Sequence, residues 1–254
     1  MGITPPPDES APAFYAQPRF LTRIGAREWW TILHPPYTLL HLSLVAVGAC
    51  LTGPVSAPRL VASLVAFFLA VGVAAHCLDE LHGRPLRTTL PAAQLIIVAT
   101  VALGGAVGLG VLGVLVVGGW FILFIVVGVL VALGYNLELF KGRLHTRAVL
   151  VLSWGGFPVL TAFYAQHRSL NFAALCAAGY GTLVTLAQQQ LSTPARDLRR
   201  RTISVEGVAE RTDGSRVAVS KQQMLDPLEN ALKTICRSGT LLALAMVASR
   251  FLHF

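Results

Sequence analysis

The sequence has little charge for its length. Only 13% of its 254 residues are charged and 12 are acidic, whereas 54% are hydrophobic. So few polar side chains cannot cover the surface of a water-soluble globule of this size. The composition therefore excludes an ordinary soluble domain and predicts an integral membrane protein.

Paired cysteines and a cleavable leader are also missing. The four cysteines stand singly, without CxxC spacing, in or beside apolar segments. This spacing gives no support for a disulfide framework or a cysteine metal site. No short hydrophobic stretch with a cleavage site lies near the start. We predict that residues 1–27 form a disordered, uncleaved cytoplasmic tail and that residues 28–254 form one transmembrane helical domain.

Long apolar runs dominate the rest of the chain. A bilayer core about 30 Å thick is crossed by roughly 20 apolar residues of helix. The Gly-rich stretch at 108–119 predicts a tight turn between the third and fourth runs. Seven segments reach the required length, at about 36–54, 58–80, 91–112, 115–136, 147–165, 171–191 and 229–253.

The basic residues are distributed unevenly between the predicted loops. Seventeen of the 20 Lys and Arg fall on one side of the membrane, and only Arg59, Arg168 and Arg250 fall on the other. The positive-inside rule then places the N-terminus in the cytoplasm. The arginines lie in short loops without interleaved aromatic residues, which does not favour nucleic-acid binding. The one long loop, 192–228, contains two β-favouring runs around Asp213-Gly214 and predicts a cytoplasmic hairpin.

Polar residues gather where the second apolar run ends, in "HCLDELHGRPLRTTLP" at 76–91. His76, Asp79 and Glu80 follow i, i+3, i+4 spacing and share one side of a helix. Arg84 and Arg87 follow directly. Carboxylates beside arginines suit Mg²⁺ and a phosphorylated ligand, because Mg²⁺ prefers carboxylate and phosphate oxygens. The alternative is an interfacial helix end whose acids are simply solvated.

This stretch resembles a shortened first aspartate-rich motif of the UbiA superfamily of intramembrane prenyltransferases. Two further stretches follow in matching order: "HPPYTLLHLSLVAVGA" at 34–49 and "GYNLELFKGRLHTRAVLVLSWGGFPVL" at 134–160. The resemblance covers roughly residues 28–200. It implies an all-α polytopic bundle around a central cavity that opens to lipid, with a polar site under the cytoplasmic rim.

The chain departs from the family pattern where a second acidic motif would stand. "LAQQQLSTPARDLRRR" at 186–201 offers glutamines, one aspartate and four arginines instead of an acidic pair. An arginine group there could hold a diphosphate by bidentate hydrogen bonds. The alternative for the arginines is a topology anchor or a contact to anionic lipid. The predicted spans also number seven, whereas the family commonly has nine.

The resemblance and the residue pattern together name candidate residues. Catalytic candidates are His76, Asp79 and Glu80, of which Asp79 and Glu80 are the candidate ligands of Mg²⁺. The predicted diphosphate-binding residues are Arg84, Arg87, Tyr135, Lys141, Arg143, Gln190, Arg196, Asp197 and Arg200. For Tyr135, Lys141 and Arg143 the alternative is the ordinary belt of interfacial aromatic and basic residues.

Two functions remain open at this point. The first is a prenyltransferase-like enzyme of the bacterial plasma membrane that acts on a polyprenyl diphosphate, by transfer to an aromatic or lipid acceptor or by cyclisation. The second is a catalytically degenerate relative that binds a lipid or quinone, or serves as a structural membrane subunit. The expected partners are an isoprenoid lipid and membrane lipids, without nucleic acid. Whether the chain forms a homo-oligomer or joins a membrane complex stays open.

Overall fold

A computed structural model describes residues 24–252 of the protein. Most of the predicted tail, 1–27, lies outside the described residues. Its last four residues are helical, because the first helix already begins at Ile24. The predicted end of the tail was therefore four residues too late.

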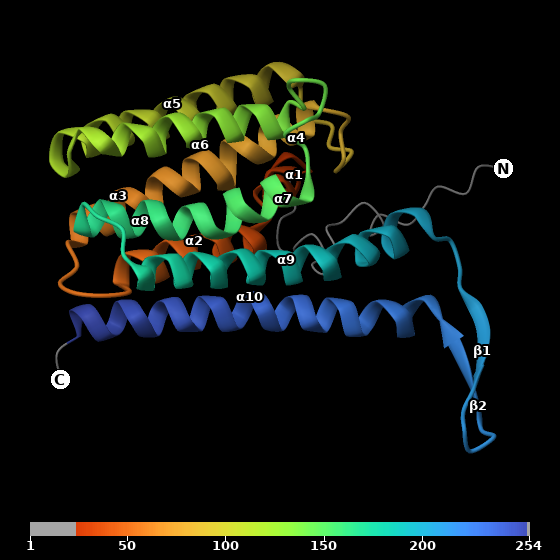
Figure 1. Cartoon of the computed structure of the whole chain (residues 1–254). Helices are drawn as coiled ribbons and strands as arrows, with labels where there is room; N and C mark the ends of the chain where they lie inside the picture. The colour runs from red at the N-terminus through yellow and green to blue at the C-terminus, as the bar shows by residue number, and fades with distance from the viewer. Residues whose placement is uncertain (1–23, 253–254) are drawn as a thin grey trace.

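The described chain is a bundle of long, roughly parallel helices with one small β-hairpin at its end (Figure 1). The elements follow in the order α1 (Ile24–Leu33), α2 (Pro35–Cys50), α3 (Ala57–Phe67), η1 (Phe68–Ala75), α4 (His76–Leu81), α5 (Ala92–Val117), η2 (Gly119–Phe121), α6 (Ile122–Asn136), α7 (Arg147–Val151), η3 (Leu152–Gly156), α8 (Phe157–His167), α9 (Phe172–Arg201), β1 (Glu206–Glu210), β2 (Arg216–Ser220) and α10 (Lys221–Phe251).

Six of the seven predicted spans are helices long and apolar enough to cross a membrane. The exception is the predicted span 171–191, which lies in α9. This helix is long enough, at 30 residues, but its C-terminal part carries Gln188, Gln189 and Gln190 and four arginines. It nevertheless packs between α8 and α10 within the bundle. The chain is therefore a multi-pass membrane protein with an all-α membrane domain.

The turn between α5 and α6 lies later than the sequence predicted. Residues 108–117 continue α5, and the chain reverses only at Gly118, where φ is +126°. Glycine alone adopts this conformation without strain. Inside a bilayer the helix continues through its glycines, because an unwound backbone there would leave hydrogen-bonding groups without partners.

Helix α2 forms the centre of the bundle, packed between α8 and α10. Close approach depends on Gly48, because a Cβ there would lie 2.3 Å from the backbone oxygen of Val159 in α8. On the other side, Arg250 of α10 donates hydrogen bonds to the carbonyl oxygens of Cys50 and Leu51 at the end of α2. The last helix of the chain is thus fastened to the first span.

The second and fifth spans each contain a stretch of π-helix. In the second span it is η1, directly before His76, and in the fifth it is η3, which contains Trp154. A π-helical turn widens the backbone and is common at functional sites. Within η3, Gly155 meets Gly181 of α9 so closely that a Cβ on Gly155 would lie 2.5 Å from the Gly181 oxygen.

The predicted hairpin in the long loop is confirmed. β1 and β2 pair antiparallel, with Glu206 opposite Ser220 and Glu210 opposite Arg216. Gly214 turns the chain with φ +77°, and Asp213 accepts a hydrogen bond from the Ser215 backbone nitrogen, which helps hold the pKa of Asp213 below its usual value. Both strands lie beyond the ends of the other helices, carried on α9 and α10 (Figure 1).

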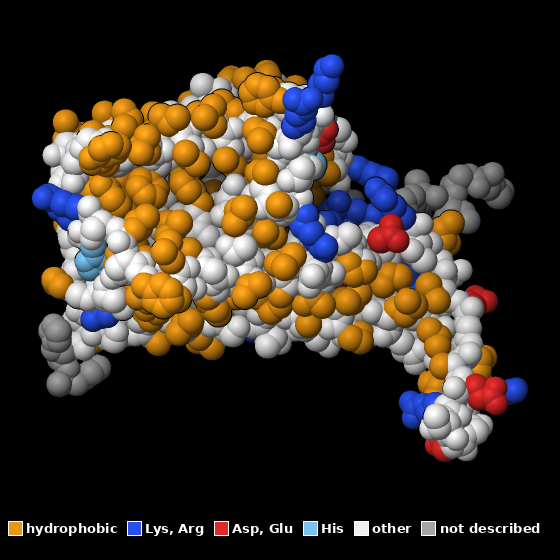
Figure 2. Space-filling model, in the orientation of Figure 1, with side chains coloured by type: hydrophobic (Ala, Val, Ile, Leu, Met, Phe, Trp, Pro, Cys, Tyr) orange, Lys and Arg blue, Asp and Glu red, His pale blue; other side chains and the backbone are white. Residues whose placement is uncertain are grey.

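Charged side chains lie mostly at the two ends of the bundle, and apolar side chains cover the middle of the face shown in Figure 2. Arg59, Arg168 and Arg250 all donate to backbone carbonyls where helices end at the pole opposite the hairpin. Basic residues are far more numerous around the end that carries the hairpin. This distribution is the one that the positive-inside rule describes.

We predict that the hairpin end faces the cytoplasm. In a variant without native cysteines, a single cysteine at Arg201 should react with a membrane-impermeant thiol reagent only in inside-out vesicles, and one at Ser169 only in right-side-out vesicles. Both residues are exposed. Labelling of both positions from the same side would contradict the topology.

Candidate functional site

A cavity of about 330 Å³ runs through the half of the bundle built by α3, η1, α5, α6, η3 and α8. Its wall is almost entirely apolar and contains many small side chains. Along the second span the lining extends from Pro58 to Ala75, or about 25 Å at 1.5 Å per helical residue. The cavity therefore reaches across most of a bilayer core.

The cavity ends beneath a cluster of polar side chains. Ala75 and Trp154 belong to its lining, and His76 and Asp79 follow Ala75 on the same helix. Asp79 interacts electrostatically with Arg196 and Arg200 of α9 and with His145 of the loop after α6. The predicted convergence of the first motif with the arginines of α9 is present in this geometry.

His76 and Asp79 are partly accessible at the end of the second span. Both side chains are half-buried by accessible surface, although protein surrounds them on most sides. Their partial exposure leaves both side chains accessible to a ligand at this end of the bundle. Arg196 is equally half-buried, and it donates only long hydrogen bonds, of 3.4 and 3.5 Å, to Ser192 and Thr193.

Glu80 is used differently from its neighbour. It is fully buried, and its carboxylate accepts hydrogen bonds from the backbone nitrogens of Leu86 and Thr88, both at 2.9 Å, and from the Thr88 hydroxyl at 2.8 Å. The metal role predicted for Glu80 is thus replaced in the structure by a structural one. The carboxylate holds the loop of residues 82–91, which we call the RPL loop, against the end of the helix.

Three further contacts fix the RPL loop over the cluster. Glu28 of α1 accepts hydrogen bonds from the Thr89 nitrogen and hydroxyl, at 2.6 and 3.1 Å. Arg84 turns inward to donate to the carbonyl oxygens of Thr88 and Leu90. Arg200 donates to the Pro85 oxygen at 3.2 Å. The predicted phosphate ligand Arg84 therefore serves the loop, and Glu28 was missed by the sequence analysis.

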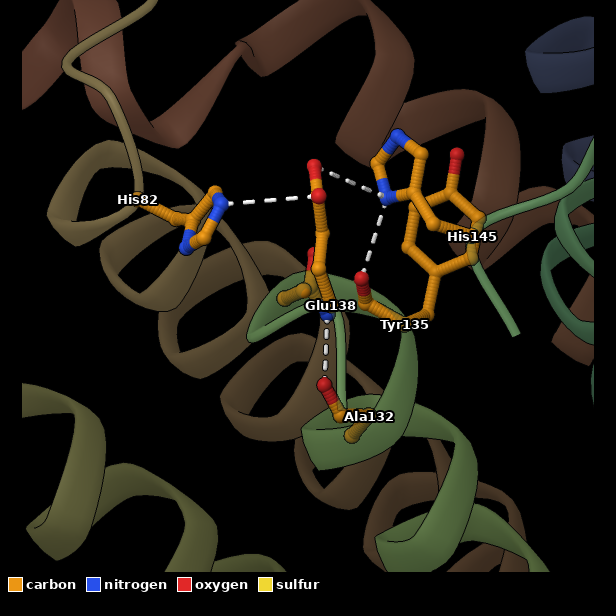
Figure 3. A network of polar contacts seen from close by, with 6 residues as sticks. His82, Ala132, Tyr135, Glu138 and His145 are labelled. Carbon is orange, nitrogen blue, oxygen red and sulfur yellow. Dashed lines mark hydrogen bonds and ion pairs between the residues drawn. The ribbon is translucent and has the colours of Figure 1, made fainter. Parts of the chain in front are cut away.

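The rim of the site carries a network of two histidines and one acid (Figure 3). Glu138 lies 3.5 Å from His82 Nε2 and 3.9 Å from His145 Nδ1. His145 also stacks on the Tyr135 ring, with centroids 4.4 Å apart, and its Nδ1 lies 3.0 Å from the Tyr135 carbonyl oxygen. The network ties the end of the second span to the loop that follows α6.

Aromatic rings separate this rim from the apolar cavity. The ring centroids of Tyr135 and Trp154 lie 5.0 Å apart, and Tyr135 also interacts electrostatically with Asp79 and Arg196. The Trp154 carbonyl is bound by His41 Nδ1 at 2.9 Å, so His41 is a hydrogen-bonded interior residue, as expected for a histidine within a span. Tyr135 thus belongs to the cluster, and its predicted contact to a diphosphate stays a prediction.

Helix α9 presents other residues to the cluster than the sequence suggested. Gln190 is exposed, and Asp197 points outward to an exposed ion pair with Arg201 at 3.8 Å. Gln188 faces inward instead, where it and Ser192 are buried beside Tyr37 of α2.

The remaining basic candidates lie on the surface. Arg87, Lys141 and Arg143 are exposed and are not among the groups that interact electrostatically with Asp79. Their placement is that of ordinary interfacial basic residues, which was the alternative for Lys141 and Arg143.

The donor set around Asp79 limits what metal it could hold. Within residues 24–252 no group of three or more His, Cys, Asp or Glu side chains is arranged to hold a metal ion. A protein-only metal cage is therefore not formed there. One carboxylate is a sufficient protein contribution for Mg²⁺ only when phosphate oxygens and water complete its octahedron.

Comparison of the chain with protein-family models, with curated proteins and with solved structures finds no match.

Proposed function

We propose that the protein is a membrane enzyme that binds a polyprenyl diphosphate and ionises its allylic carbon–oxygen bond, for transfer to an aromatic or lipid acceptor or for cyclisation. The observation that carries the proposal is the juxtaposition of a long apolar cavity with one carboxylate and two arginines at its polar end. An isoprenoid diphosphate has the same two parts, an extended hydrocarbon chain and a compact anionic head.

The geometry supports a division of roles. Arg196 and Arg200 supply positive charge to the diphosphate, and guanidinium groups bind phosphate oxygens in pairs. Asp79 would hold Mg²⁺ against the same phosphates, and that ion would offset the charge that develops on the leaving group. Arg196 also interacts electrostatically with Tyr135, which stands next to the apolar part of the site.

The cavity suits the other product of bond cleavage. As the carbon–oxygen bond breaks, its electron pair leaves with the diphosphate and an allylic cation remains in the cavity. The apolar wall keeps water from this cation. Trp154 and Tyr135 stand at the boundary between wall and polar cluster, where their ring faces can stabilise a cation.

The proposal is tested by turnover and by cavity filling. The protein in nanodiscs with Mg²⁺ should release diphosphate from geranyl, farnesyl or geranylgeranyl diphosphate. Ala70→Phe, within the cavity lining, should reduce release from the longest substrate at least tenfold more than from the shortest. Ala245→Phe is the matched control, because Ala245 is exposed on α10.

One observation favours the alternative of a non-catalytic relative. Of the two acids in the first motif, Glu80 is bonded to the RPL loop and Asp79 remains available to a ligand. A relative that had lost catalysis would keep the cavity and bind a lipid or quinone, or serve as a membrane subunit. Binding of an unreactive farnesyl thiodiphosphate without release of diphosphate from any of the three substrates would select this alternative.

A further inference from the structure

We infer that His76 is the proton acceptor of the site and that its Nε2 removes the proton that the reaction releases. The inference rests on the proposed function. When an acceptor hydroxyl or ring carbon bonds to the allylic cation, it loses one proton, and so does a cation that collapses to an olefin. A base must stand where the apolar cavity meets the polar cluster.

His76 occupies that boundary. It is the first residue after η1, it follows the cavity-lining residue Ala75, and it precedes Asp79 by one helical turn. Asp79 is already assigned to Mg²⁺ in the proposed function, and it interacts electrostatically with Arg196 and Arg200. Glu80 is already occupied by three hydrogen bonds from the RPL loop.

The tautomer of His76 leaves Nε2 as the nitrogen that can accept a proton. Its Nδ1 lies 3.1 Å from the carbonyl oxygen of Gly72. A carbonyl oxygen can only accept a hydrogen bond, so Nδ1 carries the proton of the neutral ring and Nε2 carries the lone pair. The half-buried side chain can therefore present a basic nitrogen to a bound molecule.

A second imidazole stands directly beside the first. The ring of His34 meets the ring of His76 edge to face, with centroids 4.6 Å apart. His34 sits between α1 and α2 with φ 43° and ψ 55°, a left-handed conformation that is strained for a residue with a side chain. His34 also interacts electrostatically with Arg196 and Arg200, and His41 with His76. The left-handed turn thus places a second histidine in contact with the base.

The test separates ionisation from proton removal. Farnesyl diphosphate supplied without acceptor ionises to a cation that either loses a proton to give an olefin or takes up water to give farnesol. In His76→Asn, whose amide nitrogen can still donate to the Gly72 oxygen, diphosphate release should stay within about threefold of the parent. The ratio of olefin to alcohol should fall about a hundredfold, as expected for loss of a general base.

His76→Gln provides a second variant if the asparagine protein does not fold, and His167→Asn is the matched control at the opposite pole of the bundle. An unchanged ratio with undiminished release would overturn the inference for His76 alone. Equal loss of both products would also overturn it, because His76 would then act in ionisation or folding. Absence of release in the parent would overturn the proposed function and this inference with it.

Discussion

Asp79→Asn and Arg196→Ala should each lower the turnover of prenyl diphosphates about a hundredfold, whereas Asp197→Asn should change it less than about twofold. Removal of one group that stabilises transition-state charge typically costs about 3 kcal/mol, which is roughly a hundredfold in rate. Asp79 and Arg196 interact across the polar cluster. Asp197 forms only an exposed ion pair with Arg201, and such pairs contribute little.

The measurement is diphosphate release by the three purified variants beside the parent, over a range of Mg²⁺ concentrations. Asp79→Asn should in addition raise the Mg²⁺ concentration needed for half-maximal rate, and Arg196→Ala should not. Asp197→Asn is the internal control for loss of one acid at the same end of the bundle. Equal losses in all three variants would indicate a metal site shared by two acidic motifs, contrary to the geometry.

Glu80→Ala should destabilise the protein by about 3–5 kcal/mol, because two backbone N–H groups and one hydroxyl would lose their buried acceptor. For a chain of this size such a loss lowers the melting temperature by roughly 10 °C. Heating in the presence of a thiol-reactive fluorophore reports the unfolding, since Cys50, Cys77 and Cys236 are buried.

Glu206→Ala is the matched control for this variant, because Glu206 is exposed on the hairpin. Its melting temperature should equal that of the parent. If Glu80→Ala melted with the parent but lost all turnover, Glu80 would be a ligand in the site after all, and the hydrogen bonds to the RPL loop would be dispensable.

Much of the fold could be predicted because membrane-spanning helices are recognised from the length and composition of apolar segments. Six spans and the hairpin around Asp213-Gly214 follow from local sequence. The turn at Gly118 could not be located among the glycines of 108–119, since a glycine in a membrane segment is found both at turns and at close contacts between helices. The packing of α9 in the bundle was equally hard to predict, because its Gln188 is buried beside Tyr37 of α2, which is more than 140 residues away in sequence.

The sequence brought the acids and arginines of the site to one end of the bundle, but it did not show that Glu80 accepts hydrogen bonds from the RPL loop. Adjacent residues on a helix project about 100° apart, so Asp79 and Glu80 cannot readily face one ligand. Their spacing to His76 was correct as a local feature, but it did not reveal which acid would face the loop. Glu28 carried no signal at all, because it lies 61 residues before Thr89, and only the packing of α1 brings the two together.

The central position of α2 imposes an order on the biogenesis of the protein. The span that contains this helix is made before the other five candidate spans, yet its neighbours α8 and α10 emerge from the ribosome more than 100 residues later. Until then α2 lies in the bilayer without these neighbours, although its span has the lowest mean hydropathy of the six candidate spans. A chain arrested before α10 would leave one side of α2 uncovered and the carbonyl groups of Cys50 and Leu51 without Arg250. Synthesis of α10 is therefore required before α2 is covered on both sides.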